Sequence, residues 1–562
     1  MKINFLWNPF LRCLIIGGCL LIVLQSCKTS QTTDSDTKSN KTLASGRLAD
    51  GSRYIEKAYS NASGTLNYRM FEMELPESPR EFRGVWIATV ANIDWPTSPV
   101  DPYSKQKEDF IKLLDYYQSL NFNTVIVQIR TAGDALYPSR FAPWSRYLTG
   151  KEGLKPQTNE DPLSWMILET HRRGMEFHAW LNPYRATMNL DTVSLSPEHD
   201  FFKNPEWMIK YDTKYYYNPG LPEVRAHLRN IIDEVVKNYL VDGIHFDDYF
   251  YPYKVNGLKF EDDEAYEIYN MQDQSIEDWR RENVSLLVWE ISESIKSQKP
   301  WVQFGISPFG VWRNKDQDPL GSRTNASQTN FDDLYADVLS WMRYGWIDYL
   351  IPQIYWSMEY NLASYRELVN WWSQNSYNTK IYVGNGPYKI RENADLAWNN
   401  PMEIPNQLSL SKASPNISGN AFFSAKSMYL KNRDVADLLR QQHYQYPVLP
   451  PISIRNTESP EQLTTPNLIL HGDGYAFQFE RIIKSDYRFA LIYTAPTLED
   501  LKGRGENTKF QKTYLDDNDR FVIPILNPNN QRFIALSFID RFGSETKPMI
   551  FEIQSDILIK AQ

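Results

Sequence analysis

The sequence predicts an α/β protein in which a (β/α)8 (TIM) barrel precedes an all-β sandwich of fibronectin-III or immunoglobulin type. The barrel, residues 80–446, is predicted because short apolar runs alternate with helix-periodic stretches eight times, the pattern of a parallel sheet with crossover helices. The sandwich, residues 447–562, is predicted because only short alternating runs between Gly, Asn and Pro turns follow. The 562 residues also exceed what one hydrophobic core usually serves.

The beginning of the chain predicts a lipoprotein signal peptide at residues 1–26. Lys2 and Arg12 flank an apolar run that is too short to span a bilayer comfortably. The run ends in Leu-Gln-Ser-Cys, which resembles a bacterial lipobox and implies that Cys27 is lipidated. The alternative is an uncleaved anchor helix with an incidental cysteine. Lys28 follows the cysteine, and this resembles a signal for the outer membrane.

A flexible tether and lead-in are expected at residues 27–79, because residues 28–51 are rich in Ser, Thr, Asp and Lys. The expected mature protein is therefore attached to the bacterial cell envelope through an N-terminal lipid.

The composition excludes several classes of protein. With 42% hydrophobic and 23% charged residues the chain is globular rather than disordered. A net charge of −9 argues against a nucleic-acid surface. Two of the three cysteines would leave with the signal peptide, so disulfide frameworks, thiol nucleophiles and thiolate metal sites are excluded. We expect a monomer without cofactor or metal.

The eight barrel strands are predicted at residues 82–90, 124–130, 176–184, 243–249, 302–309, 349–356, 380–388 and 417–425. Helices are predicted between them, for instance at residues 105–119, 163–173, 224–240, 276–296 and 331–344. A doubly wound open sheet is the alternative, but no GxGxxG or GxxxxGK[ST] motif follows an early strand.

In the sandwich, strands are predicted at residues 476–479, 488–493, 521–525, 532–539 and 549–553. All 17 Trp lie at or before Trp398, so this domain is not expected to be a carbohydrate-binding module with Trp platforms.

Polar and aromatic residues gather where the predicted barrel strands end, which is where this fold places active sites. Flat aromatic faces and fixed hydrogen-bonding groups are what a sugar site requires. The candidate substrate-binding residues are Asp94, Trp95, Arg130, Asp134, His178, Trp180, Asn182, Tyr184, Arg185, His245, Tyr249, Trp312, Gln353, Tyr355 and Trp356.

Four motifs carry a family resemblance: Phe-Arg-Gly-Val-Trp from Phe82, Gly-Asp-Ala-Leu-Tyr-Pro-Ser from Gly133, His-Ala-Trp-Leu-Asn-Pro-Tyr-Arg from His178 and Gly-Ile-His-Phe-Asp-Asp-Tyr from Gly243. Together they resemble glycosyl-hydrolase-like family 10, formerly domain of unknown function 187. The resemblance implies a TIM-barrel glycosidase, often secreted or lipid-anchored. Denuded peptidoglycan glycan strands are a substrate known within that family.

Asp247 and Asp248 are the candidate catalytic pair, because glycoside hydrolysis generally needs an acid and a second group at the anomeric centre. Both side chains reach one pocket only if the strand breaks at Asp247. The pair is similar to that of the family 84 N-acetylglucosaminidases, in which the substrate acetamido group is the nucleophile. A family 18 chitinase motif is also similar, but Tyr249 stands where that motif ends in Glu.

No acid ends the seventh predicted strand, so the common arrangement with Glu after strands four and seven is absent from the sequence. This favours substrate assistance, or an acid supplied by Asp94, Asp134 or Glu359. The hypothesis is that Asp248 is the general acid and that Asp247 orients the acetamido group or acts as the base; the two roles could be exchanged.

Structural explanations stand beside these assignments. The Asp pair could form a salt bridge or cap a helix, and Asp94 and Asp134 could serve turns. Arg130 and Arg185 could bind substrate carboxylates or neutralise buried acids. His178 and His245 could be satisfied barrel histidines, since HxH and HExxH are absent.

The favoured function is therefore hydrolysis of O-glycosidic bonds in an N-acetylhexosamine-containing envelope or imported glycan. Two alternatives remain: a non-catalytic glycan-binding envelope lipoprotein, and a barrel hydrolase of another class, such as a deacetylase or metal-dependent amidohydrolase.

Overall fold

A computed structural model describes residues 39–48, 51–61, 64–455, 460–461, 463–472, 474–479, 487–515, 522–525 and 530–554. The predicted signal peptide and the predicted lipidation site Cys27 lie outside these residues. None of the helices within the described ranges is long and apolar enough to cross a membrane.

Eight parallel strands close into a barrel in the order β10-β11-β12-β13-β4-β5-β6-β9. The closure confirms the predicted fold and excludes the open sheet, because β13 pairs with β4. Every predicted strand is present, although seven end earlier than expected because the chain leaves the ladder to form the loops at the C-terminal ends. The strands are β4 (Phe82–Ile87), β5 (Thr124–Arg130), β6 (Glu176–Leu181), β9 (Gly243–Phe246), β10 (Gln303–Ile306), β11 (Tyr349–Leu350), β12 (Lys380–Asn385) and β13 (Ile417–Phe422).

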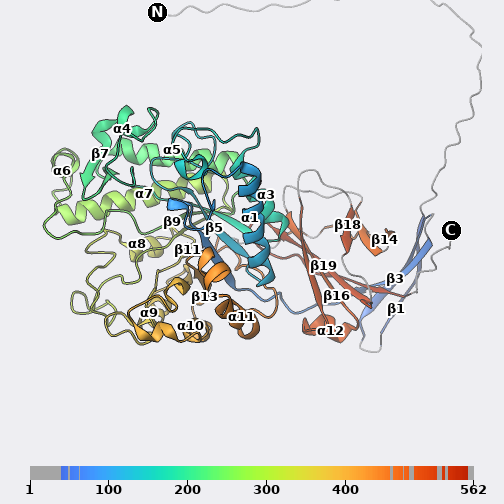
Figure 1. Cartoon of the computed structure of the whole chain (residues 1–562). Helices are drawn as coiled ribbons and strands as arrows, with labels where there is room; N and C mark the ends of the chain where they lie inside the picture. The colour runs from blue at the N-terminus through green and yellow to red at the C-terminus, as the bar shows by residue number, and fades with distance from the viewer. Residues whose placement is uncertain are drawn as a thin grey trace, which may run out of the picture.

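Helices surround the barrel (Figure 1). The predicted helix at residues 331–344 is wrong in its first half. Tyr335 has a positive φ of 51°, and the helix begins only after Asp337, whose side chain accepts a hydrogen bond from the Ser340 N–H at 3.3 Å. The main helices are α1 (Tyr103–Ser119), α3 (Pro162–Arg172), α5 (Pro222–Asn238), α7 (Ile276–Gln298), α8 (Val338–Arg343), α9 (Tyr365–Gln374), α10 (Glu403–Ala413) and α11 (Arg433–Gln442).

The loop after β6 is the longest elaboration of the barrel. It holds a short helix, α4 (Asp200–Lys203), and a hairpin of β7 (Met208–Tyr211) and β8 (Lys214–Tyr217). Two other short helices, α2 (Arg146–Thr149) and α6 (Asp263–Tyr269), lie in the loops after β5 and β9. These insertions explain why the barrel is longer than a minimal one.

The second domain is built from two antiparallel sheets. One sheet has the order β1-β2-β3-β20-β19-β16-β17, and the other has the order β14-β15-β18. Tyr68, Phe477 and Phe551 belong to the apolar core that the two sheets share. The strands from the C-terminal segment are β14 (Asn467–His471), β15 (Gly474–Gln478), β16 (Tyr487–Ala495), β17 (Lys509–Tyr514), β18 (Val522–Ile525), β19 (Phe533–Asp540) and β20 (Met549–Ile553), with α12 (Leu498–Gly503) between β16 and β17.

Three strands of this domain come from the region where a tether was expected. They are β1 (Ser39–Arg47), β2 (Arg53–Asn61) and β3 (Gly64–Glu72), and β3 pairs with β20 (Figure 1). The prediction of a tether across residues 27–79 is therefore corrected from Ser39 onward. The physical reason is a weak alternating pattern: Leu66 and Tyr68 enter the sandwich core, while Asn67 between them is only partly buried.

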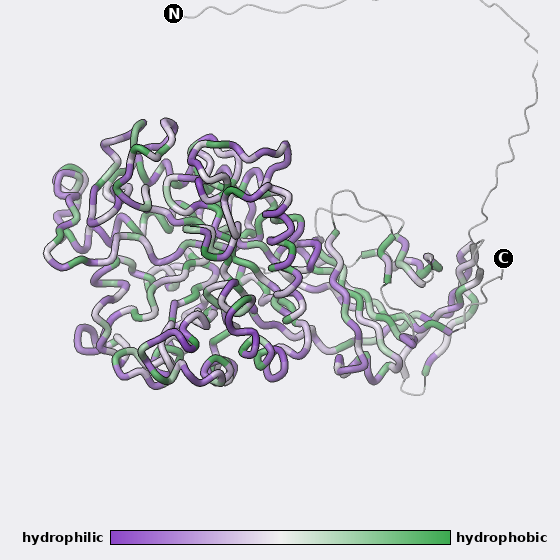
Figure 2. Tube along the Cα trace, viewed as in Figure 1, coloured by the Kyte–Doolittle hydropathy of each residue, from purple (hydrophilic) through white to green (hydrophobic). Residues whose placement is uncertain are grey.

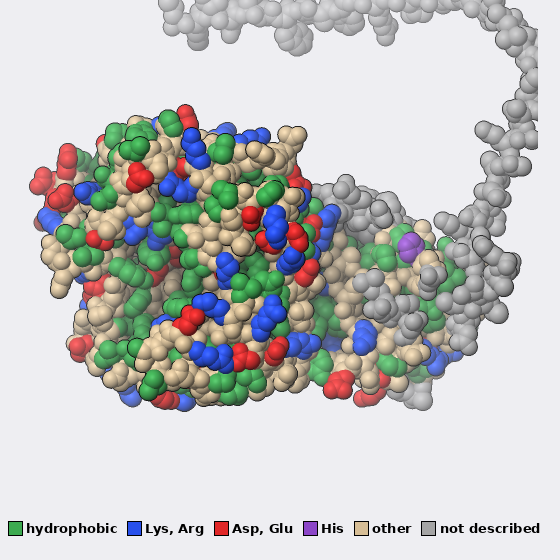
Figure 3. Space-filling view, in the orientation of Figure 1, with side chains coloured by type: hydrophobic (Ala, Val, Ile, Leu, Met, Phe, Trp, Pro, Cys, Tyr) green, Lys and Arg blue, Asp and Glu red, His purple; other side chains and the backbone are tan. Residues whose placement is uncertain are grey.

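The sandwich covers the N-terminal end of the barrel. Arg488 on β16 forms ion pairs with Asp242 and Glu176, which lie where β9 and β6 begin. Figure 2 shows the apolar strands inside each domain and polar residues concentrated on the outer helices and loops. On the face seen in Figure 3, acidic and basic side chains are interspersed over the barrel. The C-terminal ends of the barrel strands point away from the sandwich.

Candidate active site

Asp247 and Asp248 lie immediately after β9, which ends at Phe246. Asp247 is only 4% exposed to solvent and Asp248 only 2%. The strand breaks at this point: the Tyr249 N–H donates to Asp247 Oδ1 at 3.3 Å, and the Phe250 N–H donates to the Asp248 carbonyl at 3.1 Å. The break meets the condition under which neighbouring side chains of a strand can serve one site.

The two carboxyl groups hinder each other's ionisation. Burial and the charge of Asp248 raise the pKa of Asp247 to about 7, although Arg185 opposes the change. Burial also raises the pKa of Asp248, against hydrogen bonds that include one from the Tyr253 hydroxyl. Near neutral pH such a pair holds one proton readily and two charges only at a cost, as general acid–base chemistry requires.

Two further donor groups lie beside the pair. Trp180 lies against Asp247, and its buried indole N–H favours the charge of that carboxylate. Arg185 has an unpartnered Nε, and its guanidinium lies 4.1 Å from the centre of the Tyr249 ring. The Arg185 Nε is available to a polar ligand.

Asn182 and Gln128 connect the pair to the barrel wall. Asn182 Nδ2 donates to Asp247 Oδ2 at 2.5 Å, and Gln128 Nε2 donates to Asn182 Oδ1 at 2.8 Å. Gln128 was not among the predicted site residues. Its signal in the sequence is a single amide within the apolar run of β5, at a position where a core residue would otherwise stand.

Aromatic rings form two rows next to the carboxylates. In one row the ring centres of Tyr253 and Phe309 are 6.3 Å apart, and those of Phe309 and Trp356 are 5.5 Å apart. In the other, Phe423 lies 6.1 Å from Tyr355 and 6.0 Å from Tyr388. Such rings can stack against pyranose faces. The prediction named Tyr355 and Trp356 and missed Tyr253, Phe309, Tyr388 and Phe423.

The missed aromatic residues follow strand ends, but no pattern in the sequence distinguishes them from packing residues. Beyond Trp356 a cavity of about 760 Å³ continues between the loops after β11 and β12, lined among others by Tyr360, Lys389 and Asp395. Gln353, another predicted residue, donates to the Ser307 carbonyl at 2.9 Å and also favours the charge of Asp248.

Several predicted residues instead hold loops or fill the core. Asp94 accepts hydrogen bonds from the Ser424 hydroxyl and the Lys426 N–H, both at 2.7 Å, so it joins the loops after β4 and β13. Burial raises its pKa to about 6 despite these bonds. Trp95 is fully buried and donates to the Gln106 carbonyl at 2.7 Å, contrary to a role as a platform.

The loop after β5 uses its polar residues structurally as well. Asp134 accepts the N–H groups of Thr131 and Ala132, each at 3.0 Å, which is the turn role considered for it. Arg130 is buried against Tyr217, with 3.4 Å between its guanidinium and the hydroxyl. Its position differs from that of Arg185, which lies at the carboxylates.

The two barrel histidines lie inside the barrel below the carboxylates. Tyr349 is bonded to both, at 2.8 Å from His178 Nδ1 and 3.1 Å from His245 Nδ1. The Trp86 indole N–H donates to His245 Nε2 at 3.3 Å, and burial lowers the pKa of His245 well below its usual value. This is the arrangement of satisfied barrel histidines.

Tyr184 and Trp312 are also buried, and Trp312 stacks on Trp371 with 5.9 Å between ring centres. Within the described ranges, no three His, Cys, Asp or Glu side chains are grouped as a metal site would require.

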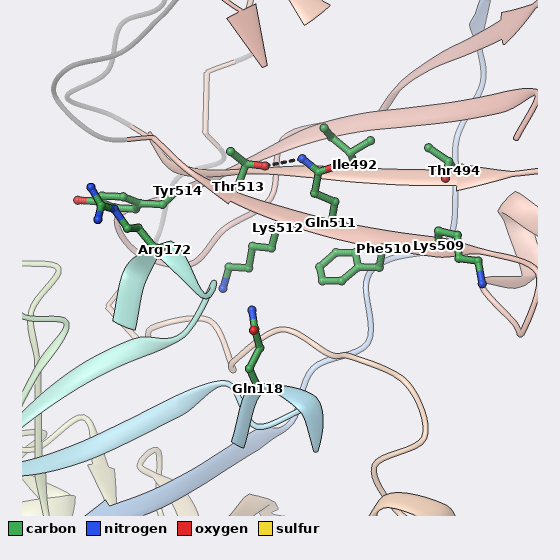
Figure 4. Close-up of a pocket in the computed structure, with 10 residues that line it drawn as sticks. All are labelled: Gln118, Arg172, Ile492, Thr494, Lys509, Phe510, Gln511, Lys512, Thr513 and Tyr514. Atoms are coloured by element: carbon green, nitrogen blue, oxygen red, sulfur yellow. Dashed lines mark hydrogen bonds between the residues drawn. The ribbon is translucent and has the colours of Figure 1, made fainter. Parts of the chain in front are cut away.

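A second cavity, of about 520 Å³, lies at the domain boundary rather than at the carboxylates. It separates the ends of α1 and α3 from strand β17, and Lys512 and Phe510 project into it towards Gln118 (Figure 4). Since it borders the covered N-terminal end of the barrel, it is not part of the candidate active site.

Comparison with known proteins agrees with this geometry. Residues 81–400 match the family described as Glycosyl hydrolase-like 10. The chain is 48% identical over 495 residues to glycosyl hydrolase YngK of Bacillus subtilis (strain 168), covering 86% of this chain and 95% of that protein. It is 39% identical over 370 residues to glycosyl hydrolase DigH of Escherichia coli (strain K12), covering 62% of this chain and 83% of that one.

Among solved structures, the glycoside hydrolase domain of PgaB (BpsB) from Bordetella bronchiseptica superposes with a TM-score of 0.44 and 12% identity, over 64% of this chain and 98% of that one. A buried carboxylate pair at the C-terminal end of a TIM barrel, aromatic walls and these sequence matches lead to one conclusion. The chain belongs to the glycosyl hydrolase-like 10 family and is a glycoside hydrolase.

Proposed function

We propose that this enzyme cleaves N-acetylhexosamine-containing glycan strands of the denuded-peptidoglycan type, with the substrate acetamido group as the nucleophile. The observation that supports the proposal is the adjacency of Asp247 and Asp248 in one buried site, with the pKa of Asp247 raised to about 7. In many glycosidases two separated carboxyl groups share the work: one attacks the anomeric carbon, or activates water there, while the other protonates the leaving oxygen. Two neighbouring carboxyl groups are too close together to reach both positions. A substrate nucleophile removes that need.

In the proposed first step, Asp248 donates its proton to the glycosidic oxygen as the bond between that oxygen and the anomeric carbon breaks. The acetamido carbonyl oxygen attacks the anomeric carbon and forms an oxazolinium ring, while ionised Asp247 accepts the acetamido N–H. Water then opens the ring, and the Asp248 carboxylate takes the proton from water. Raised pKa values suit this sequence because they keep one acid protonated near neutral pH.

The aromatic rows support binding of a glycan strand rather than a single sugar. Trp356 lines the cavity of about 760 Å³ and contacts Phe309, which contacts Tyr253 beside Asp248. This row of rings would let a chain of sugars continue from the carboxylates into the cavity. We also propose that the enzyme acts at the cell envelope, attached to the outer membrane through a lipid on Cys27, where such strands occur.

Replacement of either carboxylate tests the proposal. Asp247→Asn and Asp248→Asn should each lower hydrolysis of denuded peptidoglycan and chitin oligosaccharides by roughly 10²- to 10⁴-fold, the usual worth of positioned acid–base groups. Products are read by mass spectrometry, and folding is checked by thermal melting. Asp191→Asn, an exposed loop residue, is the matched control and should retain full activity.

Full activity in both variants would eliminate the assigned pair. Equal turnover of a glycan without acetamido groups, such as a cello-oligosaccharide, would leave the pair in place and exclude substrate assistance.

A further inference from the structure

Two buried amides link Asp247 to the main chain of the first barrel loop. The backbone N–H groups of Thr89 and Val90 donate to Gln128 Oε1 at 3.1 and 2.9 Å. Gln128 Nε2 donates to Asn182, and Asn182 donates to Asp247, at 2.8 and 2.5 Å. The chain crosses from the loop after β4 through β5 and the end of β6 to the end of β9. Gln128 and Asn182 are fully buried, so water does not compete for these bonds.

The direction of this chain follows from elementary hydrogen-bond chemistry. A backbone N–H can only donate, so the oxygen of the Gln128 amide must face Thr89 and Val90 and its nitrogen must face Asn182. Asn182 must then present its oxygen to Gln128 and its nitrogen to Asp247. Rotating either amide by 180° would place donors against donors or acceptors against acceptors. The main chain therefore determines that Asp247 faces an N–H and never a carbonyl.

We propose that Gln128 is a positioning residue for the catalytic pair: through Asn182 it holds Asp247 in the ionised form and in one orientation, and thereby leaves the proton to Asp248. Gln128 itself does not contact the carboxylate. The inference rests on the proposed function, because it assumes that Asp247 acts as the charged partner. It changes the role of Asn182 from the expected substrate ligand to the last donor of a rigid chain.

The charged and titratable groups around Asp247 do not supply this asymmetry. Asp248 and Tyr249 lie on the same segment, Arg185 comes from the loop after β6, Tyr253 from the loop after β9 and Tyr355 from the loop after β11. Arg185 favours the charge of both acids. Tyr253 is bonded to Asp248. The Trp180 indole and the Tyr249 N–H also favour the charge of Asp247, and the amide chain is the contact to Asp247 that runs through Gln128.

Gln128→Glu is the most direct test. A glutamate keeps the oxygen that accepts from Thr89 and Val90 but has no N–H to donate to Asn182. The Asn182 amide should therefore rotate by 180°, so that its carbonyl oxygen faces Asp247. The acidic limb of the pH–kcat profile, which reports ionisation of Asp247, should then move up by about one pH unit. At the wild-type optimum kcat should fall about tenfold, the worth of one hydrogen bond to a charged group, with KM nearly unchanged.

Two further variants keep the experiment decisive. Gln128→Met removes the donor without adding charge and should move the limb in the same direction if Gln128→Glu does not fold. Asn420→Asp makes the same amide-to-carboxylate change at an equally buried barrel position that bonds Asn385 and Ser411 instead. It should leave the acidic limb in place.

A folded Gln128→Glu or Gln128→Met enzyme with an unchanged acidic limb would overturn the inference. If Asp247→Asn is inactive in the same assay, the proposed function survives that failure. If Asp247→Asn remains active, the proposed function itself fails.

Discussion

The two ends of strand β9 carry equally buried carboxylates in opposite electrostatic surroundings. Asp242 precedes the strand and Asp247 follows it, only five positions later. At Asp242 burial opposes ionisation, but Arg488 and His171 outweigh it and lower the pKa. At Asp247 burial and the neighbouring charge of Asp248 prevail, and the pKa is raised to about 7.

The comparison teaches that partners rather than burial determine what a buried acid does. Asp242 also accepts hydrogen bonds from His171 Nε2 at 2.8 Å and from the Phe177 N–H at 2.7 Å. At the other end of the strand a single arginine, Arg185, favours the charges of both Asp247 and Asp248. The covered end of the barrel uses its acids for stability, whereas the open end keeps two acids in an unfavourable state that is useful for chemistry.

The largest expected effect comes from breaking the covered end. Arg488→Met removes the buried guanidinium that pairs with both Asp242 and Glu176, so the free energy of unfolding should fall by about 3–5 kcal/mol at pH 7. Because the pKa values of both acids are lowered, this stabilisation is present above their ordinary pKa near 4 and is lost as pH falls further. Urea denaturation should therefore show a larger difference from wild type at pH 7 than at pH 3.

Arg532→Met is the matched control, since Arg532 pairs with Glu552 in the same sheet but its side chain is 57% exposed. It should cost no more than about 1 kcal/mol. Equal effects of the two arginine variants would mean that the buried cluster does not hold the domains together.

The next effect has the opposite sign and concerns the open end. A folded pKa near 7, above the ordinary 3.8, means that stability is lost as pH rises through that interval. Asp247→Asn should therefore raise the free energy of unfolding by roughly 1–2 kcal/mol at pH 8 while abolishing activity, with no gain at pH 4. Thermal melting across this pH range is the measurement. A variant less stable than wild type at pH 8 would show that the pair is not in repulsion.

The smallest effect is expected from the aromatic rows. Trp356→Ala should lower kcat/KM on long glycan strands about fivefold, equivalent to roughly 1 kcal/mol of ring contact, with little change in stability. Tyr344→Ala, which removes a 70% exposed ring after α8, should leave kcat/KM unchanged. Equal losses on long strands and on a disaccharide substrate would place Trp356 at the cleavage point instead of beyond it.

Much of the fold was predictable because it depends on local patterns. The barrel strands are apolar runs bounded by turns, and Gly174 and Gly345 take the left-handed conformation expected after α3 and α8, with φ of 72° and 66°. Strands β1–β3 were not predicted, because an alternating strand acquires a face only when a partner sheet exists. Leu66 and Tyr68 look like isolated apolar residues in the sequence, and they join a core only when the sheets assemble and β3 pairs with β20 from Tyr68 onward.

The candidate site was also predictable in part. Asp247 and Asp248 stand out as adjacent acids at a strand end. Six predicted residues lie near them as expected from their positions: Trp180, Asn182, Arg185, Tyr249, Gln353 and Tyr355. Trp95, Asp94 and His245 occupy similar positions in the sequence and serve packing, a loop contact and the barrel interior. The sequence does not distinguish these residues from the site residues. A position at the end of a strand predicts which end of the barrel a residue occupies, but not the direction in which its side chain points.

The sequence by itself determined the barrel, its order of elements and the location of an acidic pair at one end, since these follow from hydrophobic periodicity and chain order. The tertiary structure alone decided which acids are compensated and which are not. That distinction depends on Arg488 reaching Asp242 from a residue 246 positions away, and on two amides crossing three strands to reach Asp247. Charge and hydrogen-bond complementarity act through space at a few ångströms, and no local pattern in the chain encodes them.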